Sequence, residues 1–124
     1  MTTICWLAEM LPERPVAALV DGVQLAVVRL TDDQIYAVGM WDPIARANVM
    51  ARGLVGSRLV DGVEVPVIFS PIYKQPYDLR TGVSLDDPEV CQGSWHAEVS
   101  GATVVVGEQL SPARAPAPTL AKAG

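Results

Sequence analysis

Residues 70–87, SPIYKQPYDLRTGVSLDD, have the pattern of a strand end, a tight loop, a second strand and a turn. Pro71 and Pro76 bracket the loop, and YDLRTG leads out of it into the next strand. A loop of this kind can present metal ligands, yet the stretch contains neither cysteine nor histidine. The sequence therefore poses the question of whether this loop serves a metal or something else.

Short apolar runs separated by turn signals extend on both sides of this stretch. Asp21-Gly22 and Asp61-Gly62 each separate two apolar runs, which predicts hairpins with type I′ turns. A further hairpin is predicted to turn at Ser100-Gly101. Residues 41–57 are irregular, with a short helix possible over 44–52. The expected fold is all-β, an antiparallel sandwich or barrel of short strands.

The length of 124 residues fits one domain. We expect a β domain over 1–110 and a flexible tail over 111–124, because the tail is rich in Ala and Pro and has no periodicity. A docking role for that tail stays open. No apolar run reaches the roughly 18–20 residues of a membrane span, and the N-terminus has no features of a secretory signal. A cytoplasmic location is expected.

The charge pattern argues against nucleic acid as a partner. The net charge is −5 and the pI is about 4.6, whereas nucleic-acid binders need a basic face. Residues 42–80 contain five basic and four acidic residues, so their net charge is +1 and that of the rest of the chain is −6. This excess is either ordinary solvated charge or the face that meets a partner protein.

Candidates for metal binding and catalysis are few. The chain has two cysteines and one histidine, without CxxC, CxH or HxxxH spacing. Cys5 lies in an apolar run and is expected to be a small buried hydrophobe, whereas Cys91 is expected in a polar loop. His96 has no recognisable partner motif, and Asp86-Asp87 precedes a proline and indicates a turn. No metal site and no catalytic site are expected in this chain alone.

Two segments carry a resemblance to a known family. WDPIARANVMARGLVGS (41–57) and VPVIFSPIYKQPYDLRTGVSLDD (65–87) resemble the small subunit of bacterial assimilatory NAD(P)H nitrite reductase, the NirD type. The resemblance runs from about Ile4 to Val106. That family is similar in fold to Rieske ferredoxins, which have stacked antiparallel sheets and two loops at one end. In Rieske domains these loops carry Cys-x-His and Cys-x-x-His, the ligands of a [2Fe–2S] cluster.

The resemblance places the four ligand positions on residues that are neither cysteine nor histidine. The first pair falls on Asp42 and Ile44, and the second on Ser70 and Tyr73. A serine hydroxyl is a poor substitute for a thiolate, and isoleucine has no ligand atom. With one histidine in the whole chain, a His₂Cys₂ site cannot be assembled. The resemblance thus implies a Rieske-like fold without its cluster.

The resemblance also implies a function. The family's enzyme reduces nitrite to ammonium with electrons from NADH or NADPH, and its FAD, siroheme and [4Fe–4S] cluster belong to the large subunit. This chain is then expected to be an accessory subunit of that oxidoreductase, docking to the large subunit through the two loops. The interface candidates are Trp41, Asp42, Arg46, Tyr73, Lys74, Gln75 and Arg80.

Other interpretations stay open at this point. Tyr73 and Tyr77 could be core residues and Lys74 an ordinary solvated charge. The three tryptophans, Trp6, Trp41 and Trp95, are expected to anchor core packing, with an interface as the alternative for Trp41. Two other functions are a Rieske-type [2Fe–2S] electron-transfer ferredoxin and a free-standing β-domain that binds a small molecule or a regulatory partner.

Overall fold

The computed structural model describes residues 1–116 and confirms the predicted all-β class. Its strands are antiparallel throughout, and the helices of the described residues are two short 3₁₀ turns. The elements in chain order are β1 (Thr2–Trp6), η1 (Leu7–Glu9), β2 (Val16–Val20), β3 (Val23–Arg29), β4 (Ile35–Gly39), β5 (Trp41–Asp42), β6 (Ala47–Asn48), η2 (Met50–Arg52), β7 (Leu54–Val60), β8 (Val63–Phe69), β9 (Pro76–Asp78), β10 (Cys91–Ser100) and β11 (Thr103–Arg114).

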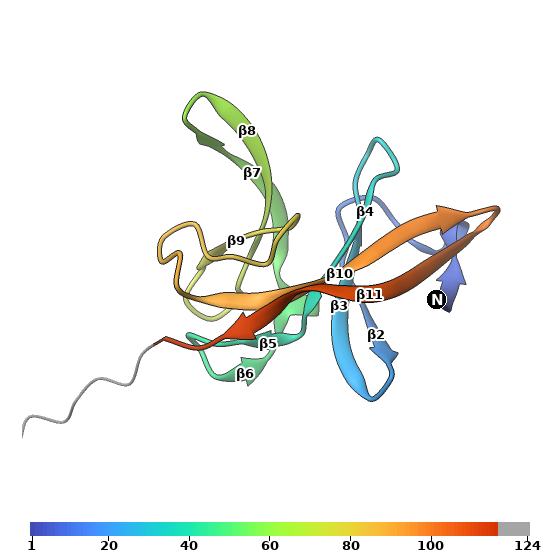
Figure 1. Cartoon of the computed structure of the whole chain (residues 1–124). Helices are drawn as coiled ribbons and strands as arrows, with labels where there is room; N and C mark the ends of the chain where they lie inside the picture. Colours follow the sequence, from blue (N-terminus) through green and yellow to red (C-terminus); the bar gives the residue numbers. More distant parts are fainter. Residues whose placement is uncertain (117–124) are drawn as a thin grey trace, which may run out of the picture.

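The strands form one large and two small sheets. The large sheet has the order β1-β11-β10-β4-β3-β2, and its edge strands β1 and β2 line one common cavity, so it is a nearly closed barrel. The small sheets are β7-β8-β9 and the pair β5-β6. Figure 1 shows both small sheets on the same side of the large one, to the left, with the β7–β8 hairpin standing away from it.

The core has two parts because β3 and β4 are covered on both faces. Along β3, Ala26 and Val28 pack toward the small sheets, while Leu25 and Val27 pack inside the barrel. Successive side chains of a strand point to opposite faces, so residues 25–28 are a continuous apolar run rather than an alternating one. The part facing the small sheets contains Tyr77 and supports the region described below.

The Asp-Gly turns have the predicted form. Asp21 and Gly22 have φ of 50° and 79°, and Asp61 and Gly62 have φ of 51° and 78°. Positive φ at both central residues defines a type I′ turn, whose twist matches the flanking strands. Each turn closes a hairpin with in-register pairing, β2–β3 and β7–β8.

Four expectations need correction. Trp6 is 58% exposed and does not anchor the core, because it lies on the outer face of an edge strand. Cys91 is fully buried in β10 rather than in a polar loop. Of the helix considered over 44–52, only the turn Met50–Arg52 forms. The boundary at residue 110 falls inside β11, which continues to Arg114. The rest of the tail, 117–124, lies outside the described residues.

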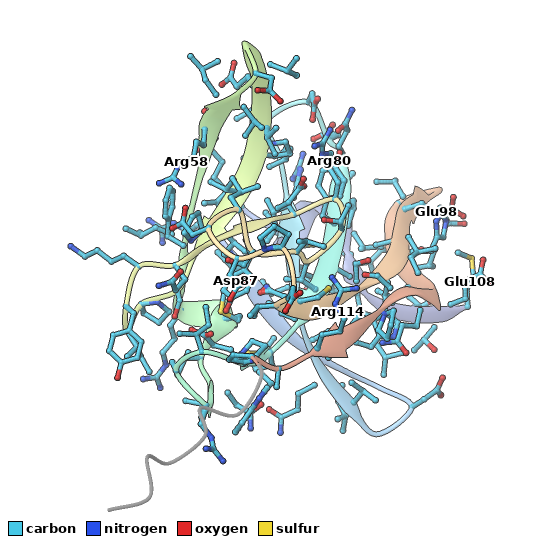
Figure 2. All side chains as sticks on the ribbon, turned by 60° about the vertical axis from the view of Figure 1, so that its left-hand side comes forward. Arg58, Arg80, Asp87, Glu98, Glu108 and Arg114 are labelled. Carbon is cyan, nitrogen blue, oxygen red and sulfur yellow. The ribbon has the colours of Figure 1, made fainter. Side chains whose placement is uncertain are left out.

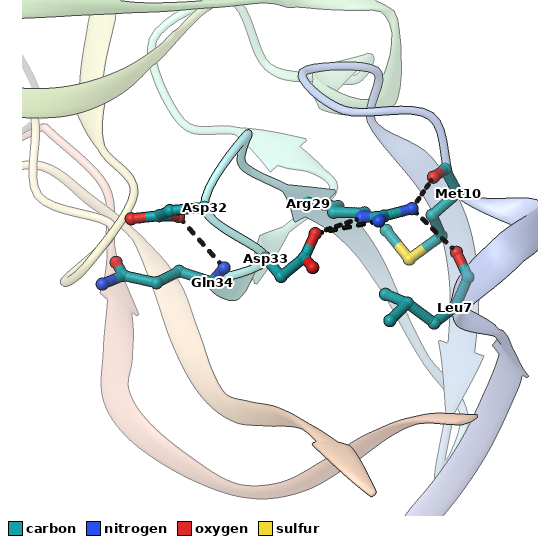
Figure 3. Close-up of polar contacts among 6 residues, drawn as sticks. All are labelled: Leu7, Met10, Arg29, Asp32, Asp33 and Gln34. Carbon is teal, nitrogen blue, oxygen red and sulfur yellow. Dashed lines mark hydrogen bonds and ion pairs between the residues drawn. The ribbon is translucent and has the colours of Figure 1, made fainter. Parts of the chain in front are cut away.

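Arg29 at the end of β3 ties the segment after β1 to the barrel (Figure 3). Its Nη1 donates to the carbonyl oxygens of Leu7 at 3.2 Å and Met10 at 2.8 Å. Its Nη2 pairs with Asp33 at 2.8 Å. The guanidinium thus satisfies two carbonyl groups of a connection that has no sheet partner of its own. Within the described residues, no helix is long and apolar enough to span a membrane.

Gly39 allows β4 and β10 to approach closely, and its replacement is the first prediction. A Cβ at this position would lie 2.1 Å from the backbone oxygen of Gln92, which cannot move without breaking the ladder. Gly39→Ala is expected to lower the free energy of unfolding by about 3 kcal/mol or more in urea titrations. Gly56→Ala, whose Cβ meets only the Phe69 ring edge at 3.3 Å, is the control and should cost much less. Equal stability of the two variants would contradict the close approach.

Candidate functional site

The first loop joins β5 to β6 and is organised by Asp42. This side chain is fully buried, and its Oδ1 accepts the backbone N–H groups of Ile44 at 2.9 Å and Ala45 at 3.2 Å. Its carbonyl oxygen accepts the N–H of Arg46 at 2.7 Å. Aspartate favours such turns because its carboxylate can satisfy amides two and three residues on. Arg46 is the last residue of the loop, directly before β6, and has a left-handed φ of 59°.

The second loop, between β8 and β9, repeats this design with Ser70. The Ser70 N–H donates to the Gln75 carbonyl at 2.9 Å, and the Ser70 carbonyl accepts the Lys74 N–H at 3.0 Å. The Ile72 N–H points to Ser70 Oγ at 3.4 Å. Lys74 has φ of 57°, nearly that of Arg46. Each loop therefore has one exposed basic residue in a left-handed conformation where its turn closes.

A single buried hydrogen bond joins the two loops. Tyr77, on β9 directly after the second loop, donates its hydroxyl to Asp42 Oδ1 at 2.6 Å. Both side chains are fully buried. The backbones also meet here, since a Cβ on Gly53 would lie 2.5 Å from the Phe69 carbonyl oxygen. The other Asp42 oxygen, Oδ2, is buried without a hydrogen-bond partner among the described residues. The loops are therefore side by side and share one carboxylate.

We call the two loops together, Trp41–Arg52 and Ser70–Gln75, the loop end. Four large apolar side chains are exposed at or beside it: Trp41, Leu54, Ile72 and Tyr73. Leu54 belongs to this group because it pairs with Phe69, the residue before the second loop. Its three basic residues, Arg46, Arg52 and Lys74, are exposed and make no ion pair with a described residue. The only acidic residue of the loop end is the buried Asp42.

The predicted interface residues fall into two groups. Trp41, Arg46, Tyr73 and Lys74 are exposed at the loop end as an interface requires, with Tyr73 64% exposed. Asp42 is buried and cannot touch a partner. The hypothesis that treated Tyr73 and Tyr77 alike as core residues fits only the second of them.

Gln75 and Arg80 differ from these four residues in other ways, since Gln75 is not fully exposed and Arg80, although exposed, lies outside the loop end and is paired. Gln75 is half-buried, and its carbonyl oxygen closes the second loop. The Arg80 guanidinium is bound to both carboxylate oxygens of Asp78, at 3.1 and 2.9 Å, and lines a groove with Tyr36 and Pro66. Figure 2 shows Arg58 and Arg80 on the side of the β7-β8-β9 sheet, and Glu98 and Glu108 on the β10–β11 hairpin. Acidic residues also lie on the side of Arg58 and Arg80, since these two pair with Asp86 and Asp78.

Sequence reasoning missed three residues at or beside the loop end and the role of Tyr77. Leu54, Ile72 and Arg52 were not among the interface candidates. Ile72 did carry a signal, because an isoleucine inside a turn-rich segment has no strand neighbours to bury it. Tyr77 carried none, since its partner Asp42 is 35 residues away in the sequence.

The buried hydroxyl of Tyr77 is expected to make the free energy of unfolding depend on pH in the alkaline range. Burial, and then the hydrogen bond to Asp42, raise the pKa of Tyr77 well above its ordinary value of 10.0. The unfolded chain therefore loses this proton before the folded chain does. The stabilisation is complete below about pH 10 and declines above it, by up to about 1.4 kcal/mol per pH unit.

The measurement is urea unfolding of the wild type and of Tyr77→Phe on both sides of pH 10. The variant should show the shallower decline, because it lacks the group that titrates only in the unfolded chain. Tyr36, whose pKa burial also raises, is present in both proteins and cancels in the comparison. Identical slopes would exclude a buried, hydrogen-bonded hydroxyl at position 77.

The comparisons with known proteins agree with this architecture. The model of the Rieske-like [2Fe-2S] domain matches residues 1–107, so the chain belongs to that family. Within it, the chain is 40% identical to a structure assigned to the NADH-dependent nitrite reductase small subunit of Mycobacterium tuberculosis. That match has a TM-score of 0.79 and covers 85% of this chain and 91% of the other. The nitrite reductase (NADH) small subunit of Salmonella typhimurium is 30% identical over 82% of this chain and 91% of its own length.

A third relative is much longer than this chain. The nitrite reductase [NAD(P)H] large subunit of Klebsiella oxytoca is 36% identical over 114 residues. These residues are 92% of this chain but only 11% of the Klebsiella protein. In that protein, a segment homologous to this chain is thus part of a polypeptide that carries the name of the large subunit.

The residues that the resemblance places at the ligand positions do not fit the [2Fe–2S] cluster that the family name implies. Asp42 Oδ1 is occupied by three hydrogen bonds from the chain itself, and Ile44 offers no donor atom. Ser70 Oγ lies within its own loop, and Tyr73 is exposed at the surface. No group of three His, Cys, Asp or Glu side chains that could hold a metal occurs in residues 1–116. The fold is that of the family, whereas the ligand chemistry is not.

Proposed function

We propose that this chain is the accessory small subunit of a cytoplasmic NAD(P)H-dependent nitrite reductase, which converts nitrite to ammonium in nitrogen assimilation. The observation that carries the proposal is the homology to nitrite reductase small subunits over nearly their full length. FAD, siroheme and a [4Fe–4S] cluster would belong to the large subunit. This chain would act by docking to it and would carry no redox centre.

The Klebsiella relative supports the large subunit as the partner. A segment similar to this chain is part of the Klebsiella protein named as a nitrite reductase large subunit. Covalent linkage keeps two domains at a high effective concentration, which favours their contact. A separate small subunit would have to achieve the same contact through its own surface.

The loop end supports a particular mode of docking. Its exposed tryptophan, tyrosine and aliphatic side chains supply the apolar area that interface centres contain, and Arg46, Arg52 and Lys74 add positive charge to the same loops. None of these cations is neutralised by a described carboxylate. The complementary surface on the large subunit would have an apolar centre edged by Asp and Glu side chains.

Catalysis by the chain alone has little support in the described residues. His96 pairs with Glu98 at 3.3 Å on the exposed part of β10, and no nucleophile is bound to it there. Cys91 is fully buried and contacts the carbonyl of Thr81 at 3.5 Å. These contacts are structural, and the chemistry would take place in the partner.

The proposal is tested by adding the purified chain to the isolated large subunit of the same organism. The expected result is a complex that elutes as one species and reduces nitrite faster with NADH or NADPH than the large subunit does alone. The chain itself should be colourless, since a [2Fe–2S] protein absorbs visible light. Separate elution together with unchanged nitrite turnover would refute the proposal.

A further inference from the structure

We infer that the Asp42–Tyr77 hydrogen bond links the two loops in place of a metal cluster, and that this link positions Arg46 and Lys74 for docking. The second half of the inference rests on the proposed function, whereas the first half concerns the chain alone. The starting point is the misfit of the ligand positions. Asp42, which the resemblance places at one of these positions, instead makes a hydrogen bond that connects the two loops.

The bond has the geometry of a strong link. It is 2.6 Å long, and both side chains are excluded from solvent, so water does not compete for it. Among the described residues, it is the only side-chain hydrogen bond between the two loops. One end lies on β5, before the first loop, and the other on β9, after the second.

The strands that carry the first loop are too short to hold it alone. β5 and β6 have two residues each, whereas the second loop joins the seven-residue β8 to β9, which has three. A hairpin as short as β5–β6 is not stable without further contacts. Asp42 supplies those contacts, because one oxygen accepts two amides of its own loop and the hydroxyl from the other strand. Loss of the hydroxyl would leave the first loop held by its own hydrogen bonds and by the packing of Ile44, Met50 and Ala51 on the core, without a side-chain hydrogen bond to β9.

Backbone hydrogen bonds connect this link to both Arg46 and Lys74. The Arg46 N–H is bound to the Asp42 carbonyl, so a shift of Asp42 carries Arg46 with it. The Lys74 N–H is bound to the Ser70 carbonyl, and the Ser70 N–H to Gln75, directly before β9 and Tyr77. Fixing Asp42 against Tyr77 therefore fixes Arg46 and Lys74 relative to each other. Two charges at a fixed separation can pair with two carboxylates of a partner without further ordering of the loops.

The test uses Tyr77→Phe, which removes the hydroxyl and keeps the ring in the core. Tyr36→Phe is the matched control, because its hydroxyl also makes a 2.6 Å hydrogen bond, to Gln34, but at an exposed site. Val104→Ala in the barrel part of the core is the control for a general loss of stability. Two quantities are measured: amide hydrogen exchange in the isolated chain, and affinity for the large subunit by titration of nitrite turnover.

In Tyr77→Phe, amides of residues 44–46 and 72–75 should exchange at least about tenfold faster. Its affinity for the large subunit should fall by about tenfold, with turnover at saturation unchanged. Both controls should stay within about twofold of the wild type in loop exchange and affinity. The comparison with Val104→Ala separates an effect on the position of the loops from a general loss of stability, because this variant lowers stability without changing the loops.

Each other outcome overturns a defined part of the account. Unchanged loop exchange in Tyr77→Phe would overturn the link, whatever the affinity. Faster loop exchange with unchanged affinity would overturn its role in docking. If the wild type itself fails to bind the large subunit, the proposed function fails, while faster loop exchange in the variant still supports the link.

Discussion

Asp42→Ala is expected to lower the free energy of unfolding by about 3–5 kcal/mol, from the cost of leaving buried donors unpaired. The substitution removes the acceptor of three hydrogen bonds, those of the Ile44 amide, the Ala45 amide and the Tyr77 hydroxyl. The hydroxyl is fully buried and has no other partner among the described residues. A domain of this size is stable by only about 5–15 kcal/mol, so the variant should approach global instability.

The measurement is urea unfolding followed by circular dichroism, with two comparisons. Asp42→Asn retains the Oδ1 acceptor and should cost clearly less than the alanine variant. Asp32→Ala is the surface control, because its carboxylate likewise accepts a backbone amide two residues on, from Gln34 at 3.1 Å, but in an exposed turn. If Asp42→Ala costs no more than Asp32→Ala, the carboxylate does not organise the loops.

The double variant Arg46→Glu/Lys74→Glu is expected to bind the large subunit at least about a hundredfold more weakly, because like charges placed opposite one another cost several kcal/mol. Both side chains are exposed and free of ion pairs with described residues, so their reversal leaves the fold intact. The affinity is measured by titrating nitrite turnover of the large subunit with each variant. The effect should weaken as salt is raised.

The control is a charge reversal away from the loop end. Arg14 is exposed between η1 and β2 and makes no ion pair with a described residue. Arg14→Glu should bind nearly as well as the wild type, whereas either single reversal at the loop end should bind more weakly. Equal loss at Arg14 and at Arg46 would mean that net charge, rather than the loop end, governs association.

Much of the fold could be predicted because its signals are local. The Asp-Gly pairs need only their own positive φ and two flanking apolar runs to define hairpins. The family resemblance added the arrangement of the sheets and the position of the two loops. β5 and β6 were missed as strands because two-residue strands have no periodicity to detect.

The burial of single side chains was harder to predict from the sequence, since it depends on neighbours that are distant in sequence. Cys91 lies in a segment that looks polar, yet it is buried at the start of β10, where it pairs with Arg114 on one side and forms a bridge with Val83 on the other. Trp6 looks like a core anchor, yet β1 is an edge strand. Asp42 was assigned to the surface as a charged loop residue, because nothing local indicates the Tyr77 hydroxyl that pairs with it.

Docking through the loop end is tested by hydrogen exchange of this chain with and without the large subunit. Complex formation is expected to protect amides of residues 41–42, 44–52 and 72–75. The β10–β11 turn, at the right of Figure 1 and away from the small sheets, should exchange as in the free chain. Protection of that turn, with loop exchange unchanged in the complex, would contradict docking through the loop end.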